Sequence, residues 1–213
     1  MCQFLVSIDW LKLLQTFAVL FTAFIAYGAV NTWKRQAKAK KQTDFLDELT
    51  DTVHEYIQAL SRPLEFLKFI YISFESHRNL SPESDNDEYS HIIAYIQSRG
   101  EEDSEKLWEH LKKGNDLVAI IESLVVRGQV YSFMNYVICQ NSVKMLLWQH
   151  QRIQIVASMI GNPSFNWKNE KVIKGIENML TVQPEDIEEH LKNHNINFIE
   201  FVSDNYNDIY KGT

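Results

Sequence analysis

The stretch LLQTFAVLFTAFIAYGAVNTW, residues 13–33, carries no ionisable side chain except the phenol of Tyr27. A helix rises about 1.5 Å per residue, so about 20 apolar residues cross the roughly 30 Å hydrocarbon core of a bilayer. Trp10 and Trp33 flank the stretch, and an amphipathic indole ring is suited to the headgroup region. The sequence therefore predicts one transmembrane helix at 13–33, surrounded by membrane lipid.

A basic cluster comes directly after this stretch, whereas residues 1–12 hold only Asp9 and Lys12 as charged side chains. The cluster consists of Lys34, Arg35, Lys38, Lys40 and Lys41. An excess of Lys and Arg marks the cytoplasmic side of a span. We therefore expect a single-pass protein of the cell inner membrane, with residues 1–12 as a short non-cytoplasmic tail and the C-terminal part in the cytoplasm. The cluster could also contact anionic lipid headgroups, although the orientation signal alone accounts for it.

A cleaved signal peptide is the competing interpretation of the apolar stretch. It would need a basic start, an apolar centre of about 7 to 15 residues and a small-residue cleavage site. Here the basic residues come after the apolar part, and the apolar part is too long. The sequence therefore favours a retained span over a cleaved leader.

Small residues recur at every fourth position within the predicted span, at Ala18, Thr22 and Ala26. Such a stripe lets two helix backbones approach closely in lipid. We treat these residues as a candidate association face and expect a homo-oligomer. The alternative is that alanine is simply common in membrane helices.

The rest of the chain predicts an all-α fold. Seven glycines and four prolines are few for 213 residues, and apolar residues recur at intervals of three and four. We expect residues 34–61 to form a basic juxtamembrane and amphipathic helix that continues the span. Residues 62–213 should form an acidic cytoplasmic helical bundle, with a helix break where Arg62 precedes Pro63. The formal net charge of −7 disfavours direct nucleic-acid binding.

The segment 64–74 is apolar on nearly every side of its predicted helix. All-round hydrophobicity indicates burial, so this segment is a candidate core helix. A dimer interface and a membrane-inserting segment are the alternatives. The residues that carry this prediction are Leu64, Leu67, Ile70, Tyr71 and Phe74.

Further along the chain, polar and glycine residues predict the helix boundaries. A helix should start at Asp103 or Ser104 and end at Gly114. Residues 117–160 should form one long helix or two in line, interrupted near Gly128. Charged residues interrupt them too often for a second span, and Asn197 is expected to cap a last helix.

The sequence contains no recognisable catalytic motif. Neither a glycine-rich phosphate loop nor a nucleophile elbow is present, and Cys139 lies in an apolar helix where a thiol is usually a buried hydrophobe. His190 and His194 have the spacing of two metal ligands but lack a third. The acidic clusters at 101–103 and 185–189 coincide with predicted helix starts, where carboxylates are favourable. We therefore expect no enzyme, no catalytic residue, no cofactor and no metal site.

The layout of the whole chain resembles the transmembrane effectors of bacterial retron antiphage defence systems. The elements that carry the resemblance are the span LLQTFAVLFTAFIAYGAVNTW, its continuation into KRQ, and an acidic helical domain without catalytic motifs. Such effectors are often described with two spans, whereas one is predicted here. The resemblance implies a protein held inactive with a reverse transcriptase and its RNA–DNA product until phage interference is sensed, after which it damages the inner membrane. The alternative is a membrane-tethered adaptor or sensor that binds another cytoplasmic protein without perturbing the bilayer.

Overall fold

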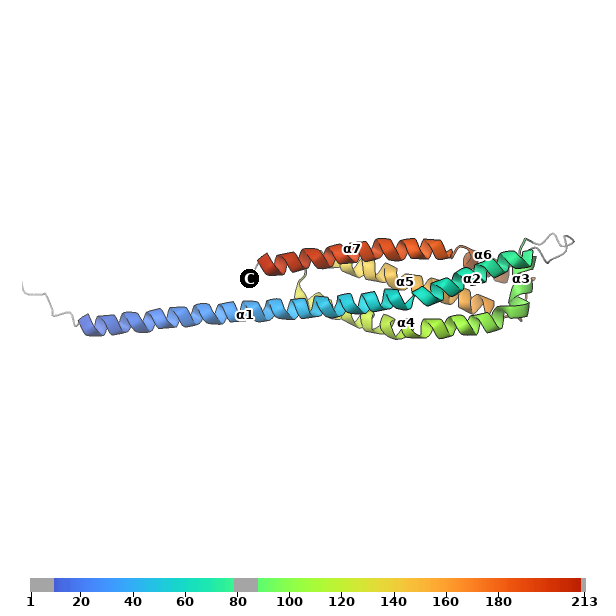
Figure 1. Cartoon of the computed structure of the whole chain (residues 1–213). Coiled ribbons are helices and arrows are strands. Elements are labelled where there is room, and N and C mark those ends of the chain that lie inside the picture. The colour runs from blue at the N-terminus through green and yellow to red at the C-terminus, as the bar shows by residue number, and fades with distance from the viewer. Residues whose placement is uncertain (1–9, 79–87, 212–213) are drawn as a thin grey trace, which may run out of the picture. The chain divides into compact units, whose positions relative to one another are not determined.

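The computed structural model describes residues 10–78 and 88–211, which are helical except for short turns (Figure 1). The predicted all-α fold class is confirmed, since no strand occurs in these two ranges. Residues 45–205 form one compact unit, and the described residues outside it belong to a second unit. The elements are α1 (Trp10–Ala59), α2 (Ser61–Arg78), α3 (Ser90–Tyr95), the π-helix η1 (Ile96–Gly100), α4 (Glu101–Gly128), the 3₁₀ helix η2 (Gln129–Tyr131), α5 (Tyr136–Ile160), α6 (Glu170–Leu180) and α7 (Pro184–Lys211).

Helix α1 runs without interruption from the apolar stretch into the bundle sequence, as expected from the absence of any proline between Trp10 and Ala59. Its apolar stretch is the one part of the described chain that is long and apolar enough to cross a membrane, and none of that stretch is buried. Residues 10–12 of the predicted tail are helical, and residues 1–9 lie outside the described residues.

The break between α1 and α2 falls at Leu60, so the prediction that Arg62 leaves the helix is wrong. Pro63 is the third residue of α2, where a backbone N–H would have no acceptor within the helix. The amide of Leu64 donates to the carbonyl of Leu60 over 3.0 Å. The proline therefore starts α2 at little cost and leaves it almost continuous with α1.

The bundle core begins where α1 changes from being exposed on all sides to being buried on one side. Buried side chains match the helical repeat through Phe45, Leu49, Val53 and Tyr56. The hydroxyl of Tyr56 is buried as well, and it donates to the carbonyl of Leu146 on α5 over 2.9 Å. An apolar stripe and a satisfied polar group thus join α1 to the rest of the bundle.

Gly114 lies inside α4, so the prediction that it ends a helix is wrong. A Cβ atom at this position would lie 2.8 Å from Cε1 and 2.9 Å from Nδ1 of the His150 ring on α5. The neighbouring Asn115 caps no helix, and its Oδ1 lies 2.7 Å from Nε2 of His150. Gly114 therefore serves close packing between two helices instead of helix termination.

The segment 117–160 forms a hairpin, so the prediction of one long helix or two in line is wrong. The interruption near Gly128 is present, because α4 ends there and α5 runs back along it (Figure 1). Ser132 and Asn135 adopt left-handed backbone conformations with φ of 55° and 52°. These two residues reverse the chain, and the hydroxyl of Tyr136 then donates to the carbonyl of Val125 across the turn over 2.7 Å.

Two other predicted helix boundaries are also wrong. The π-helix η1 joins α3 to α4 directly, so no helix starts at Asp103 or Ser104. Helix α7 continues through Asn197, because its buried residues keep the three-and-four spacing from Ile187 through Leu191 to Phe198. In both places continued packing outweighs a local capping signal.

A methyl group added at Gly100 should destabilise the bundle, because its Cβ would lie 2.3 Å from the backbone oxygen of Ile160. Overpacking of this kind typically costs about 1–3 kcal/mol, so Gly100→Ala should lower the free energy of unfolding by that order. Chemical denaturation monitored by circular dichroism measures this change. Gly175→Ala is the matched control, since its Cβ would meet only the flexible end of Met159, at 3.2 Å. Equal stability of the two variants would contradict the steric argument.

Candidate functional site

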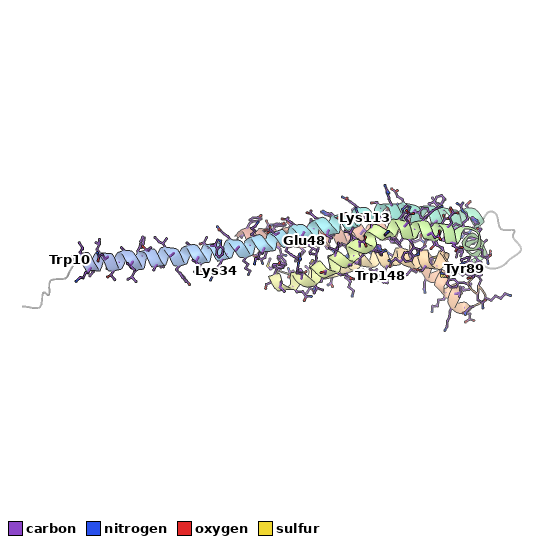
Figure 2. All side chains as sticks on the ribbon, turned by 90° about the horizontal axis from the view of Figure 1, so that it is seen from below. Trp10, Lys34, Glu48, Tyr89, Lys113 and Trp148 are labelled. Carbon is purple, nitrogen blue, oxygen red and sulfur yellow. The ribbon has the colours of Figure 1, made fainter. Side chains whose placement is uncertain are left out.

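The apolar stretch of α1 exposes large side chains on all of its faces. Leu14, Val19 and Leu20 are 73%, 69% and 62% exposed, and at about 100° per residue they lie on three different sides of the helix. Figure 2 shows side chains projecting on both sides of the helix between Trp10 and Lys34. Exposing this much contiguous apolar surface to water is unfavourable by about 25 cal/mol per Å², whereas a lipid environment removes that cost. The stretch therefore has the length and the exposed apolar surface of a helix that can cross a membrane.

The predicted association face lies on this exposed stretch. Ala18, Thr22 and Ala26 share one side of α1 because their spacing of four is close to a helical turn of about 3.6 residues, and all three are exposed. The hydroxyl of Thr22 donates to the carbonyl of Ala18 over 2.8 Å. This bond satisfies the polar group inside its own helix, as a lipid-facing position requires.

The basic cluster lies next on the same helix. Lys34, Arg35, Lys38, Lys40 and Lys41 are all exposed. Lys40 forms a surface ion pair with Asp44 one turn later, with 3.7 Å between the nitrogen and oxygen atoms. The cluster is thus a band of solvent-exposed positive charge next to the apolar stretch.

The predicted core or interface helix lies within α2. Leu64, Leu67, Ile70 and Phe74 are buried in the bundle, and the hydroxyl of half-buried Tyr71 donates to the carbonyl of Met179 over 2.9 Å. The face formed by the four buried residues is occupied by this chain itself. It offers no free surface to a partner.

The histidine pair predicted to be a poor metal site lies on α7. The rings of His190 and His194 are stacked with their centroids 6.0 Å apart. Among the described residues no group of three potential metal ligands occurs. The pKa of His194 is lowered by partial burial and by the neighbouring His190, so protonation of this ring is disfavoured.

One member of the first acidic cluster, Asp103, has a role that the sequence did not indicate. Its side chain is buried and accepts a hydrogen bond from the hydroxyl of Tyr95 over 2.7 Å. Burial also raises the pKa of Tyr95, so this hydroxyl stays protonated and remains a donor. Both clusters lie at the start of a helix as predicted, the first in α4, which begins at Glu101, and the second in α7, which begins at Pro184.

His150 is a second buried polar residue that sequence reasoning missed. Its ring packs 6.3 Å from that of Tyr56, and burial lowers its pKa. Its Nε2 lies within hydrogen-bond distance of Oδ1 of Asn115, whereas its buried Nδ1 has no hydrogen-bond partner among the described residues. The sequence around His150 does not indicate that the ring is buried, because its burial depends on Gly114 of the facing helix α4.

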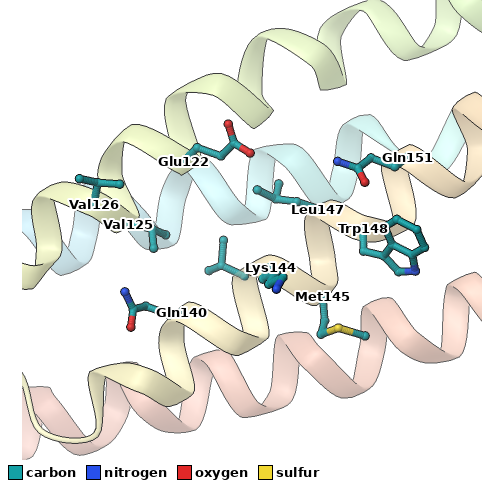
Figure 3. Close-up of a pocket in the computed structure, with 10 residues that line it drawn as sticks. Glu122, Val125, Val126, Gln140, Lys144, Met145, Leu147, Trp148 and Gln151 are labelled. Atoms are coloured by element: carbon teal, nitrogen blue, oxygen red, sulfur yellow. The ribbon is translucent and has the colours of Figure 1, made fainter.

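An open groove of about 640 Å³ lies between α4 and α5 (Figure 3). Among the residues that line it, Val125 is half-buried and Leu147 is buried, whereas Val126 and Trp148 are exposed at 67% and 45%. Most of the lining is apolar, with Glu122, Gln140, Lys144 and Gln151 as its polar side chains. No sequence motif indicated this groove, because its two walls come from separate helices.

Comparison with protein families, with curated proteins and with solved structures finds no match to this chain. The described residues hold three candidate contact surfaces, which are a helix long and apolar enough to cross a membrane, a basic band after it on α1, and an open apolar groove in the bundle. Each of these is a surface for contact with lipid or protein. Asp103 and His150, two of the polar residues buried in the bundle, contact neighbouring helices and do not line this groove.

The thiol of Cys139 should be unreactive in the folded protein. Burial raises its pKa to about 12, so only about one thiol in ten thousand is ionised at pH 8, compared with roughly a quarter for an ordinary cysteine. In a Cys2→Ser variant, labelling by a maleimide should therefore be slow in buffer and fast in denaturant. Complete labelling of the native protein within minutes would show that the thiol is accessible and would reopen a chemical role.

Proposed function

We propose that this chain is a non-enzymatic effector anchored in the inner membrane by one span, with its helical bundle in the cytoplasm. The observation that carries the proposal is the exposed apolar stretch of α1 with the exposed basic band directly after it. Lipid accommodates the apolar stretch, and the excess of Lys and Arg after it favours a cytoplasmic location for the bundle. The anchor thereby confines the bundle to the membrane surface.

Action through self-association of the span is the mechanism we infer for this effector. Ala18, Thr22 and Ala26 present small side chains on one exposed face, and Thr22 needs no partner for its hydroxyl. Helices that meet through such faces pack closely in lipid. As the resemblance to retron-type effectors implies, association would be restrained by a reverse transcriptase and its RNA–DNA product, and release would lead to disruption of the membrane.

An adaptor or sensor is the second candidate function. The observation that favours it is the groove between α4 and α5, because an exposed tryptophan beside an apolar concavity is typical of protein contact sites. In this case the span would only tether the bundle, and the membrane would stay intact. The two candidates share the anchor and differ in what the span does after assembly.

Two arginines placed in the span should release the protein from the membrane. Each Arg near the centre of a span costs about 2.5–3.5 kcal/mol on insertion scales, so Leu20→Arg with Phe24→Arg should move most of the protein out of the carbonate-resistant membrane fraction. The control is Leu20→Ile with Phe24→Leu, which keeps the stretch apolar. Retention of the arginine variant in the membrane fraction would contradict anchoring by this helix.

Expression of the intact chain should depolarise cells in a way that depends on the small-residue face. Ala18→Leu, Thr22→Leu and Ala26→Leu together should abolish most of the signal from a potential-sensitive dye, because bulky side chains keep the helices apart. Val19→Leu, Ile25→Leu and Val30→Leu form the control set at other positions of the same span. Depolarisation that survives the first set would argue against this face, and a potential unchanged by the intact chain, alone and with its neighbouring genes, would favour the adaptor.

A further inference from the structure

No described part of this chain covers the groove between α4 and α5, although most of its lining side chains are apolar. Val126 and Trp148 stand on opposite walls of the groove, on α4 and α5 (Figure 3). Val130 on η2 and Ile155 on α5 are further apolar residues that are exposed, at 75% and 42%. An aromatic anchor flanked by aliphatic side chains is the composition of an interface centre, where water is excluded.

The charges that line the groove are opposite in sign, and each helix contributes one. Glu122 on α4 and Lys144 on α5 are both exposed, and neither forms an ion pair with any residue that the structure describes. A partner for this groove should therefore present one base and one acid at matching positions.

The two charges also lie at similar heights along the hairpin. Glu122 precedes the end of α4 at Gly128 by six residues, and Lys144 lies eight residues after the start of α5 at Tyr136. At about 1.5 Å per residue they are roughly 9 Å and 12 Å from the turn, a difference smaller than one helical turn. A two-fold axis along the hairpin would keep these heights and would place each acid level with the base of the other copy.

We propose that the groove binds the same groove of a second copy of this chain. α4 of each copy lies against α5 of the other, and Glu122 of each copy pairs with Lys144 of the other. Trp148 faces the part of the opposing α4 that carries the small, exposed Ala119, which leaves room for the indole ring. A self-complementary patch of this kind is what a two-fold dimer requires, and confinement of both copies to one membrane raises their effective concentration.

This contact differs from association through the span and stands without it. It predicts dimers held by the bundle even when the span is exchanged for an unrelated apolar one. It also predicts that the two charges act as a pair between copies and have no such role within one copy.

The test is charge exchange in the full-length chain in detergent, with the dimer dissociation constant measured by dilution of fluorescently labelled protein. Glu122→Lys and Lys144→Glu should each weaken the dimer at least about tenfold, because like charges then face each other in the interface. The double variant should recover the original constant to within about threefold, since the pairing is restored in reverse. Glu109→Lys and Lys174→Glu are the controls on exposed surfaces of α4 and α6 and should change nothing.

Trp148→Ala provides a second readout, and it should weaken the dimer while circular dichroism and thermal unfolding remain those of the parent. A monomer at all concentrations, single charge variants without effect, or a double variant no better than the singles would each overturn the proposal. Dimers that resist the charge variants but disappear when the span is exchanged would also overturn it, and would leave the proposed action of the span standing.

Discussion

The structure depends on one helix that carries two kinds of apolar surface. Before Trp33, α1 is apolar on every side and exposed, whereas from Phe45 onward its buried residues occupy a single stripe. The first pattern is stable in lipid, and the second is stable against other helices in water. The charged residues between them separate the two patterns along one uninterrupted element. The membrane-length apolar stretch and the first part of the bundle core therefore belong to the same helix.

Close approach of backbones is the second constraint on the bundle. Gly100 and Gly114 lie where a Cβ atom would collide with α5, at the Ile160 carbonyl and the His150 ring. Such positions hold η1 and α4 against α5 in one register, because a small displacement would bring larger side chains into those contacts. Buried hydrogen bonds further specify which helices are neighbours, since the hydroxyl of Tyr56 donates to the carbonyl of Leu146 and that of Tyr95 donates to Asp103. The core thus specifies which helix surfaces remain outside.

The surfaces left outside determine what the chain can do. The face of α2 that carries Leu64, Leu67, Ile70 and Phe74 is buried in the core. The wall of the α4–α5 groove remains exposed, with Trp148 at its edge. An exposed apolar helix and an open interhelical groove are both surfaces suited to contact with lipid or protein. This combination is why association, in the bilayer and at the bundle surface, is the activity that we propose for the chain.

The sequence by itself determined the all-α class, the apolar stretch at 13–33 and the basic band, because length, periodicity and charge order are local properties. It also indicated the apolar character of the residues from Leu64 to Phe74. Helix ends at Arg62, Gly114 and Asn197 and the course of residues 117–160 were predicted wrongly, since packing between distant helices outweighs a local breaker or cap. Only the tertiary structure decided that Gly114 faces His150, that Asp103 is buried against Tyr95, and that α4 and α5 leave a groove. Those features depend on which helices become neighbours, and no single segment carries that information.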